Sequence, residues 1–448
     1  MVVEQLSTRP ASVIASYGDA AALETTRRIA GARVVLIHYE RLLADFPFLR
    51  PHALMAANPE LQRVAGASDA PAIFRKIVDQ WFTENAALIS RAQAEPSEVN
   101  ARVVTEGPPR TVCRPPRYGR ACIAEVLPTI IHLDELHDPV KLQGGGELDI
   151  KGVGVREGRR PMQGAYTDGL LSLPDALQEY MVELLIEAVL AHAGAPVRTL
   201  PHYGIIDAGF EGAFGDHSFP AALIVRRSHM RDLHSDLPRW DSEDHYLTVR
   251  TEMLLRRYGI TSSRWRGFEI RDDDGTLGVY SRDARIDHSH ALICCLVEYL
   301  DLQLPFVADC INVQLATADE TGVRQIVDFG QYSARASFDR PVVSLVNGRP
   351  MAWGGLIVPS DDTFARPDPA LVPTGHSDRD LLGVEQVQPH RDEWSRSRNR
   401  LLQRIASEIA ASFRRSELDR DAVGARIAAT LENLTSVWPP DDGARHRQ

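Results

Sequence analysis

The chain has 448 residues, of which 44% are hydrophobic and 25% are charged, and its formal net charge is −11. At roughly 100–200 residues per domain, this length corresponds to roughly two to four domains or lobes. The composition excludes intrinsic disorder and collagen-like or low-complexity chains, and the acidic balance disfavours a protein that mainly coats nucleic acid.

The basic residues are unusually biased, because only three of the 50 are lysines: Lys76, Lys141 and Lys151. This bias is typical of a GC-rich bacterial genome. The five cysteines include no CxxC pair, which favours a reducing compartment over a disulfide framework. No signal-peptide pattern and no apolar run of about 18 residues occurs, so we expect a cytoplasmic protein with no membrane contact.

The first 105 residues are predicted to be helical. Apolar residues recur at three- and four-residue spacing over Ala20–Leu43 and Ala70–Ala94, which predicts two helices and a helical N-terminal extension over 1–105. The next twelve residues, EGPPRTVCRPPR, hold four prolines and predict an extended entry into the next part of the chain.

Residues 106–235 are predicted to be rich in strands. Short apolar runs at Ala121–Ile131, Glu147–Val153 and Ala221–Val225 indicate strands. One long helix is expected between them at Leu173–His192, since Ser172 before it and glycine and proline after it are start and stop signals.

Residues 236–360 are predicted to be mainly helical up to about residue 305, notably at Tyr246–Tyr258 and Ser289–Leu302, and then to form β-like runs. These runs are Asn312–Ala316 and Arg324–Phe329, and Asn347-Gly348 is typical of a hairpin turn. The remainder, 361–448, is predicted to be a linker and a helical region, Glu393–Trp438. The order of elements predicts an α+β chain with the outline of a bilobal protein-kinase-like fold and helical extensions at both ends.

Lys151 ends an alternating run, Glu147–Lys151, and is followed by a glycine. A lysine on a strand can hold a nucleotide phosphate when a carboxylate on a facing helix fixes its position, and Glu179 in the predicted helix is the candidate. Two surface charges are an equal alternative from spacing alone. The scarcity of lysine adds weight to Lys151, because a compact ammonium differs from the planar arginine fork.

Further residues could complete a phosphate and metal site. Gly119, before the strand that starts near Ala121, would let the backbone approach phosphates, although a plain turn is the common alternative. Asp328-Phe329-Gly330 follows a β-like run, as in a magnesium-binding DFG motif, and Asn312 precedes that run. Arg156 and the two arginines after it fit either a loop that meets phosphate or an exposed loop.

Several of these segments resemble the selenoprotein O family, which are protein-kinase-like enzymes that hold ATP flipped and transfer AMP to protein hydroxyls. The similarity runs from about Gly119 to about Ser333. It is carried by GRA at Gly119–Ala121, ELDIKGVG at Glu147–Gly154, TDGLLSLPDALQEY at Thr167–Tyr180, GAPVRT at Gly194–Thr199, SHMR at Ser228–Arg231 and VDFG at Val327–Gly330.

The resemblance implies a nucleotide site and a metal site. It implies that Lys151 pairs with Glu179, that Arg231 contacts the ATP phosphates, and that Asn312 and Asp328 bind Mg²⁺ or Mn²⁺. Gly119, Arg120 and Ala121 correspond to the family's nucleotide loop.

The chain also departs from the family pattern. Ile224 replaces a family arginine that helps to hold the phosphates, with Arg226 or Arg227 as candidate substitutes, and Ile311 replaces the family's aspartate before the metal asparagine. Asp309 is then the nearest candidate general base.

The sequence therefore favours an ATP- and Mg²⁺-dependent transferase that moves AMP to a hydroxyl or other acceptor on a protein, peptide or small molecule. Phosphoryl transfer from the γ-position is a close alternative, and a pseudokinase that binds partners is an alternative of another class. No nucleic-acid or membrane partner is expected. The terminal helical regions could serve docking or a homo-oligomer.

Overall fold

The computed structural model describes most of the first half of the chain and parts of the second. The described residues are 12–64, 70–115, 118–163, 167–192, 197–230, 267–272, 275–281, 314–316, 323–329, 332–336, 341–345 and 400–435. They belong to two compact units. The first is Met1–Leu177 with Pro201–Met230 and Ser407–Gly424, and the second is Gln178–Leu200 with Arg231–Ala406 and Ala425–Gln448. The predicted helices Tyr246–Tyr258 and Ser289–Leu302, and the turn at Asn347-Gly348, lie outside the described residues.

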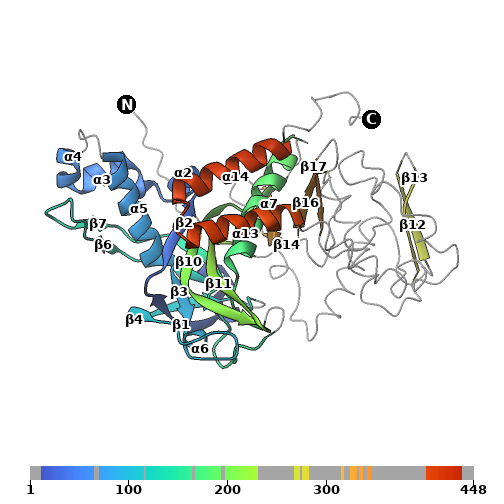
Figure 1. The fold of residues 1–448 in the computed structure, drawn as a ribbon, viewed down its shortest axis with the longest axis horizontal. Coiled ribbons are helices and arrows are strands. Elements are labelled where there is room, and N and C mark those ends of the chain that lie inside the picture. Colours follow the sequence, from blue (N-terminus) through green and yellow to red (C-terminus); the bar gives the residue numbers. More distant parts are fainter. Residues whose placement is uncertain are drawn as a thin grey trace. The chain divides into compact units, whose positions relative to one another are not determined.

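An eight-stranded sheet in which all neighbours are antiparallel organises the first unit (Figure 1). Its strands in spatial order are β2 (Arg33–Ile37), β10 (His202–Phe214), β11 (His217–Arg227), β8 (Glu147–Lys151), β5 (Ala121–Glu125), β4 (Thr105–Arg114), β1 (Ala22–Ile29) and β3 (Leu88–Ser90). The lysine-bearing β8 is therefore an interior strand, with β11 and β5 on its two sides.

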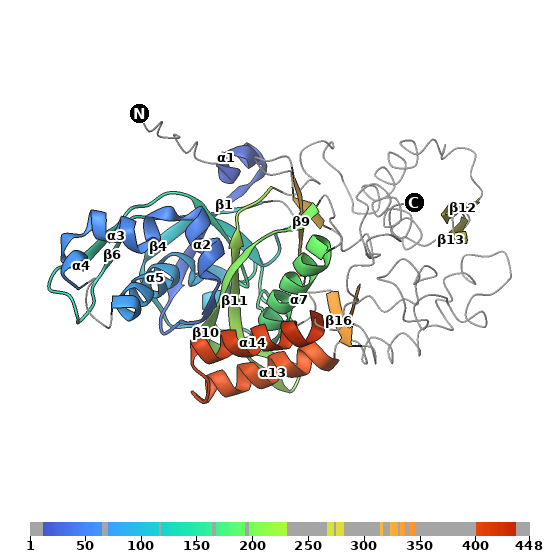
Figure 2. The same ribbon diagram turned by 90° about the horizontal axis from the view of Figure 1, so that it is seen from above.

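The helices of the first unit are gathered beside this sheet (Figures 1 and 2). They are α2 (Tyr39–Asp45), α3 (Pro51–Ala57), α4 (Pro59–Val64) and α5 (Ala70–Ala86), with the short α1 (Val13–Tyr17), α6 (Arg91–Ala94) and two 3₁₀ turns, Gly18–Ala20 and Pro47–Leu49. In α5, the apolar side chains Ile73, Ile77 and Trp81 recur at four-residue spacing and are buried in one core with the sheet. A small hairpin, β6 (Thr129–Ile131) and β7 (Val140–Leu142), completes this unit.

The stretch Ser407–Gly424, which holds the end of α13 (Arg400–Arg414) and the start of α14 (Arg420–Thr435), is fastened to the same unit by charge. Arg414 donates to both oxygens of the buried Asp207 on β10, at 2.8 and 3.1 Å, and Arg33 on β2 pairs with the same carboxylate at 3.0 Å. Arg420 pairs with Asp79 on α5. The two helices confirm the predicted helical region near the C-terminus.

The second unit carries most of α7 (Leu173–His192), which begins in the first unit, and a three-stranded sheet. In that sheet β14 (Gln314–Ala316) pairs antiparallel with β15 (Arg324–Val327), and β15 pairs parallel with β9 (Val197–Thr199). Two further hairpins are β12–β13 (Gly267–Asp272, Gly275–Ser281) and β16–β17 (Tyr332–Ala336, Pro341–Leu345). The bounds predicted for α7 are confirmed, and its first turn is capped by the Ser172 hydroxyl, which accepts from Asp175 N at 3.1 Å.

The predicted helix at Ala20–Leu43 is wrong, because β1 and β2 occupy this region and only α2 near its end is helical. The residues that β1 buries include the polar Glu24 and Thr26, whereas its Leu23 is 69% exposed. Because polar residues are buried and an apolar residue is exposed, the alternation of apolar and polar residues that indicates a strand could not be recognised in β1. The first 105 residues are therefore not simply helical.

Three other boundaries differ from the predictions. The helix expected over Ala70–Ala94 ends at Ala86 and is followed by β3, and the run Ala121–Ile131 is divided between β5 and β6. The segment expected to be mainly helical before residue 305 contains the β12–β13 hairpin. The structure is thus mixed α+β with a large antiparallel sheet.

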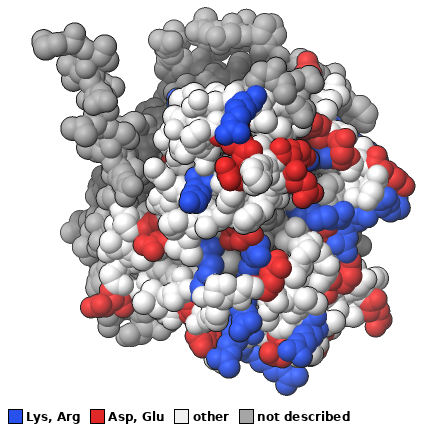
Figure 3. Space-filling model, turned by 90° about the vertical axis from the view of Figure 1, so that its left-hand side faces the viewer, with Lys and Arg blue, Asp and Glu red and all other residues white. Residues whose placement is uncertain are grey.

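One face of the molecule shows basic and acidic side chains interspersed (Figure 3). Ion pairs at the surface of the first unit include those of Arg28 with Glu84 and Glu106, of Lys76 with Glu135 and of Arg75 with Asp421. Interspersed charges of this kind keep a surface soluble without creating a single-sign field.

Candidate functional site

Lys151 is the last residue of β8 and is 6% exposed. Its register partners are Ala121 on β5 and Ile224 on β11. Lys76 and Lys141 are both exposed, so Lys151 is the buried member of the three lysines. A buried ammonium ion costs free energy unless the fold compensates its charge, which makes Lys151 a better functional candidate than an exposed lysine.

The two glycines that follow Lys151 are required by the backbone and by close packing. Gly152 has φ of +100°, and a Cβ there would lie 2.4 Å from the carbonyl oxygen of Ala222. Gly154 has φ of +99°, and a Cβ there would lie 2.3 Å from the Cβ of Gln93. Only glycine accepts both constraints without strain, so the chain is forced to leave the sheet directly after the lysine.

The Gly119–Ala121 segment is tied to the end of the lysine strand. The carbonyl oxygen of Arg120 accepts from Gly152 N at 2.8 Å and from Val153 N at 3.1 Å. Among the described residues, no atom outside its chain neighbours lies within 4 Å of the place where a Cβ on Gly119 would stand. Protein packing therefore does not demand a glycine at this position, and the open space could admit a ligand close to the backbone.

The side chain of Arg120 is turned towards the segment before α7. Its Nη1 donates to the carbonyl oxygen of Leu170 at 2.8 Å. Asp168 lies in the same place, where burial raises the pKa of its carboxyl and the charge of Arg120 acts in the opposite direction. The Oδ1 atom of Asp168 has no hydrogen-bond partner among the residues whose structure is described. Asp168 was not singled out in the sequence, although it belongs to the Thr167–Tyr180 segment that carries the resemblance.

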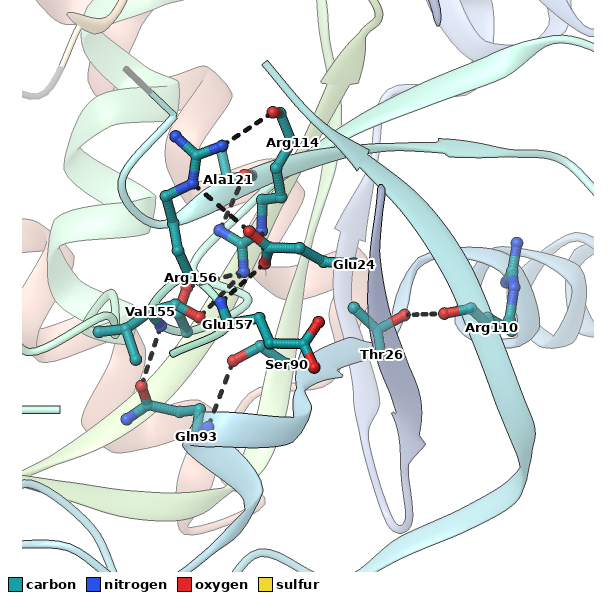
Figure 4. Close-up of polar contacts among 11 residues, drawn as sticks. Glu24, Thr26, Ser90, Gln93, Arg110, Arg114, Ala121, Val155, Arg156 and Glu157 are labelled. Atoms are coloured by element: carbon teal, nitrogen blue, oxygen red, sulfur yellow. Dashed lines mark hydrogen bonds and ion pairs between the residues drawn. The ribbon is translucent and has the colours of Figure 1, made fainter. Parts of the chain in front are cut away.

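A buried ion-pair cluster fixes the loop after Gly152 (Figure 4). Arg114 at the end of β4 is fully buried, its Nε lies 3.1 Å from Glu24 Oε2, and it donates to the carbonyl oxygens of Ala121 at 2.9 Å and Gly154 at 3.0 Å. The same Glu24 carboxylate accepts from Glu157 N at 3.1 Å. Arg114 therefore joins the first residue of β5 to the loop that follows β8.

Arg156, one of the three loop arginines, is held in this cluster. Its Nε lies 3.4 Å from Glu24 Oε1, and its Nη2 donates to the carbonyl oxygen of Arg114 at 3.0 Å (Figure 4). Arg159 and Arg160 are exposed. The three arginines were expected either to meet phosphate or to lie in an exposed loop. The contacts of Arg156 that the structure describes are with protein atoms.

The two arginines named as substitutes for the missing family arginine both have acidic partners. Arg226 is 1% exposed and pairs through Nε with Asp149 at 2.9 Å. Arg227 donates to both carboxylate oxygens of Asp45 at 2.8 and 2.7 Å, and Asp45 also accepts from the Tyr203 hydroxyl. Burial acts to lower the pKa of Arg227, and the charges of Tyr203 and Asp45 outweigh it and raise that pKa.

In the second unit, the structure relates the helix of Glu179 to the strand that precedes Asp328. Glu179 is 1% exposed on α7. The next element, β9, is the parallel partner of β15, and Thr199 Oγ1 lies 2.5 Å from Glu183 Oε1 and 2.7 Å from Glu187 Oε2 on α7. The predicted pairing of Glu179 with Lys151 stays a prediction.

Asp328 follows β15 and has a φ of +69°, in the left-handed region that non-glycine residues rarely adopt. Its side chain is half-buried, and the adjacent Phe329 is fully buried. Aspartate and asparagine adopt this conformation more readily than other non-glycine residues, and the metal-ligating role of Asp328 stays a prediction.

Three predicted site residues, Arg231, Asp309 and Asn312, lie outside the described residues. Within the described part of the chain, no group of three or more His, Cys, Asp or Glu side chains is arranged to hold a metal ion. Asp328 is the single predicted metal ligand for which a position is described.

No protein-family model matches this chain, and no curated protein sequence matches it significantly. Among the helices described, none is both long and apolar enough to span a membrane.

Proposed function

We propose that this chain is an ATP- and Mg²⁺-dependent transferase with a protein-kinase-like fold related to the selenoprotein O family. It moves AMP from ATP to a hydroxyl or other acceptor on a protein, peptide or small molecule. The acceptor's class is left open, since no described surface distinguishes these three.

The main support for the proposal is that the turn at Gly119 leads into a strand that pairs with β8, the strand that ends at the buried Lys151. Ala121 is the register partner of Lys151, Arg120 accepts two backbone hydrogen bonds from the residues after Lys151, and Gly119 borders open space. The chain then continues through α7, which bears Glu179, and returns as the β10–β11 hairpin beside the lysine strand. Glycine turn, lysine strand and glutamate helix in this order are the phosphate-binding elements of protein kinases, and the same order here supports the proposal.

In the proposed mechanism, Lys151 neutralises phosphate charge and is positioned by Glu179, while the backbone of Gly119–Ala121 borders the phosphates. Asn312 and Asp328 hold the metal ion, for which a carboxylate and an amide oxygen are suitable hard ligands. The metal ion supplies charge neutralisation of the phosphate oxygens. Arg231 stabilises the transferring or leaving phosphate, and Asp309 orients the acceptor hydroxyl. Catalysis then consists of positioning and electrostatic stabilisation.

Titration calorimetry of the full chain with ATP and MgCl₂ tests this proposal. We expect wild-type protein to bind ATP and Lys151→Met to bind at least about tenfold more weakly, which corresponds to about 1.4 kcal/mol of lost binding free energy. Lys141→Met, on an exposed lysine, is the matched control and should bind as wild type does. Absence of ATP binding by the wild type, or equal affinity of all three proteins, overturns the proposal.

Transfer of the γ-phosphate is the second candidate, and one observation favours it. The position opposite Lys151 on β11 is the buried, apolar Ile224, and the nearby Arg226 and Arg227 are paired with Asp149 and Asp45. A guanidinium held by a carboxylate has less charge to offer the phosphates of a flipped ATP. ATP labelled at the α-phosphate in one reaction and at the γ-phosphate in another separates the two, because AMP transfer labels the product only from the α-position.

A catalytically inactive scaffold predicts a different result in the same assay. Label incorporated by the wild type and lost in Asp328→Ala requires a metal-dependent reaction, which a scaffold does not perform. Incorporation that is equal in the two proteins contradicts the metal role of Asp328.

A further inference from the structure

His229 is 4% exposed and contacts residues from two other segments of the first unit as well as Arg227 in its own segment. Its Nε2 lies 3.1 Å from the hydroxyl of Tyr118, and its Nδ1 lies 3.3 Å from the carbonyl oxygen of Arg227 and 3.4 Å from Asp149 Oδ2. Tyr118 precedes β5, Asp149 is on β8, and Arg227 ends β11. One imidazole thus contacts two segments, those of Tyr118 and Asp149, that are distant from it in the sequence.

These contacts determine which nitrogen of His229 carries the proton. Both groups near Nδ1, a backbone carbonyl and a carboxylate, are acceptors, so Nδ1 is the donor. In a neutral imidazole Nε2 is then an acceptor, and it receives the O–H of Tyr118. The hydroxyl of Tyr118 is therefore oriented by His229 and not by solvent, since the tyrosine is 2% exposed.

The other carboxylate oxygen of Asp149, Oδ1, is bound by an arginine. Asp149 is fully buried and pairs with Arg226, its register partner across β8 and β11, at 2.9 Å. The hydroxyl of Tyr17 on α1 donates to the carbonyl oxygen of His229 at 3.5 Å. Tyr17 and Tyr118 also belong to one small apolar cluster with Ala121 and Ile123. The histidine is therefore held through both its ring and its backbone.

In the sequence, each residue of this network is one or two positions away from a residue of the proposed phosphate site. Tyr118 directly precedes Gly119, Asp149 is two residues before Lys151, and His229 is two residues before Arg231. Residues two apart on a strand share one face of the sheet, so Asp149 and Lys151 project to the same side of β8. Within the first unit, the network thus connects the turn at Gly119 with the last residues of β8 and β11.

We propose that His229 is a positioning residue that sets the spacing between the Gly119 turn and the ends of β8 and β11 through its hydrogen bond with Tyr118. The inference rests on the proposed function, because the quantity it controls is the affinity for ATP phosphates. It adds two residues, His229 and Tyr118, that do not themselves touch the nucleotide.

The test compares two tyrosine variants that each lose one hydroxyl from the first unit. Tyr118→Phe removes the hydrogen bond to His229. Tyr39→Phe removes a bond of 3.2 Å to Asp79 on α5, in a region with no residue of the proposed site. Each variant loses one hydrogen bond, so both should lose similar, small amounts of thermal stability.

We expect Tyr118→Phe to raise the dissociation constant of MgATP by about three- to tenfold, and Tyr39→Phe to leave it unchanged, with all proteins compared well below their melting temperatures. His229→Gln keeps an acceptor on its side-chain amide and should bind MgATP more tightly than His229→Ala. If His229→Ala does not fold, the tyrosine pair still decides the question.

The outcomes separate this inference from the proposal on which it rests. If wild-type protein binds no MgATP, the proposed function fails. If the wild type binds and Tyr118→Phe binds equally well, the positioning role is overturned. It is also overturned if Tyr118→Phe and Tyr39→Phe weaken binding equally, since the effect would then follow from general stability.

Discussion

Replacement of Glu24 by glutamine should destabilise the fold far more than an ordinary strand substitution, because it leaves Arg114 buried without its counterion. Arg114 is fully buried, and Glu24 is 5% exposed. Glutamine keeps the shape and one acceptor oxygen for Glu157 N but loses the charge. Removal of one partner from a buried ion pair typically costs about 3–5 kcal/mol. The carbonyl oxygens of Ala121, Gly154 and Val155 that accept from Arg114 remain, so we expect Glu24→Gln to fall at the lower end of this range, at about 3 kcal/mol.

A double-mutant cycle isolates the pair from its surroundings. Arg114→Met alone should also be strongly destabilising, because it leaves the Glu24 carboxylate buried and removes the bonds to Ala121 and the Gly154 loop. The variant with both changes should cost less than the sum of the two by about 2 kcal/mol, within the range for contacting charges. The matched control is the exposed pair Arg415 and Glu417, at 2.7 Å, where Glu417→Gln should leave stability unchanged.

Urea unfolding of the full chain, followed by far-ultraviolet circular dichroism and by tryptophan fluorescence, measures these free energies. Trp81 is fully buried in the core of the first unit and reports on its unfolding. Additive effects of Glu24→Gln and Arg114→Met, within about 0.5 kcal/mol, would refute the reasoning, since residues without interaction add in this way. A loss below about 1 kcal/mol for Glu24→Gln would refute the claim that the charge of Arg114 needs this partner.

Three further predictions follow from individual residues. Gly119→Ala should leave the melting temperature unchanged but weaken MgATP binding in calorimetry, whereas Gly152→Ala, with its φ of +100° and a 2.4 Å contact, should cost more than about 1 kcal/mol in urea unfolding. Asp328→Asn should fold normally, because asparagine tolerates a φ of +69°, and should abolish label transfer from ATP; unchanged transfer contradicts its metal role. Burial raises the pKa of the Cys113 thiol to about 11 and of the Cys122 thiol to about 12. Iodoacetamide at pH 8.5 should therefore not label either residue before unfolding, as judged by peptide mass spectrometry. Their contribution to stability should be complete below pH 9 and decline as the pH rises towards 12.

The sequence predicted those elements whose signals are local. The helix α7 begins after Ser172 and Pro174 lies in its first turn, so its bounds follow from capping chemistry alone. The β14–β15 hairpin and the lysine strand were also recognisable from short apolar runs. The lysine itself stood out because it is rare in a chain that otherwise uses arginine.

The prediction from sequence was wrong where polar residues are buried and apolar residues are exposed. In β1 the buried face carries Glu24 and Thr26, so the alternation of apolar and polar residues that indicates a strand is reversed. Glu24 is buried because Arg114, 90 residues later in the chain, pairs with it. No periodicity within a short window can reveal a partner at that distance, and the same holds for Tyr118 and His229.

The buried charges of the first unit are concentrated where the proposed phosphate-binding segments meet. Arg114 joins Ala121 to the loop after Gly152, and Arg226 pairs with Asp149 beside Lys151. Apolar side chains of similar volume would often stabilise such positions as well or better, because burial of an ion pair costs desolvation energy. Apolar packing has no preferred direction. A guanidinium that donates hydrogen bonds to particular carbonyl oxygens instead holds two backbone segments at a separation that varies only within the range of hydrogen-bond lengths. A phosphate site that works by positioning requires backbone segments at a closely defined separation. We infer that this requirement is why the first unit retains these charges.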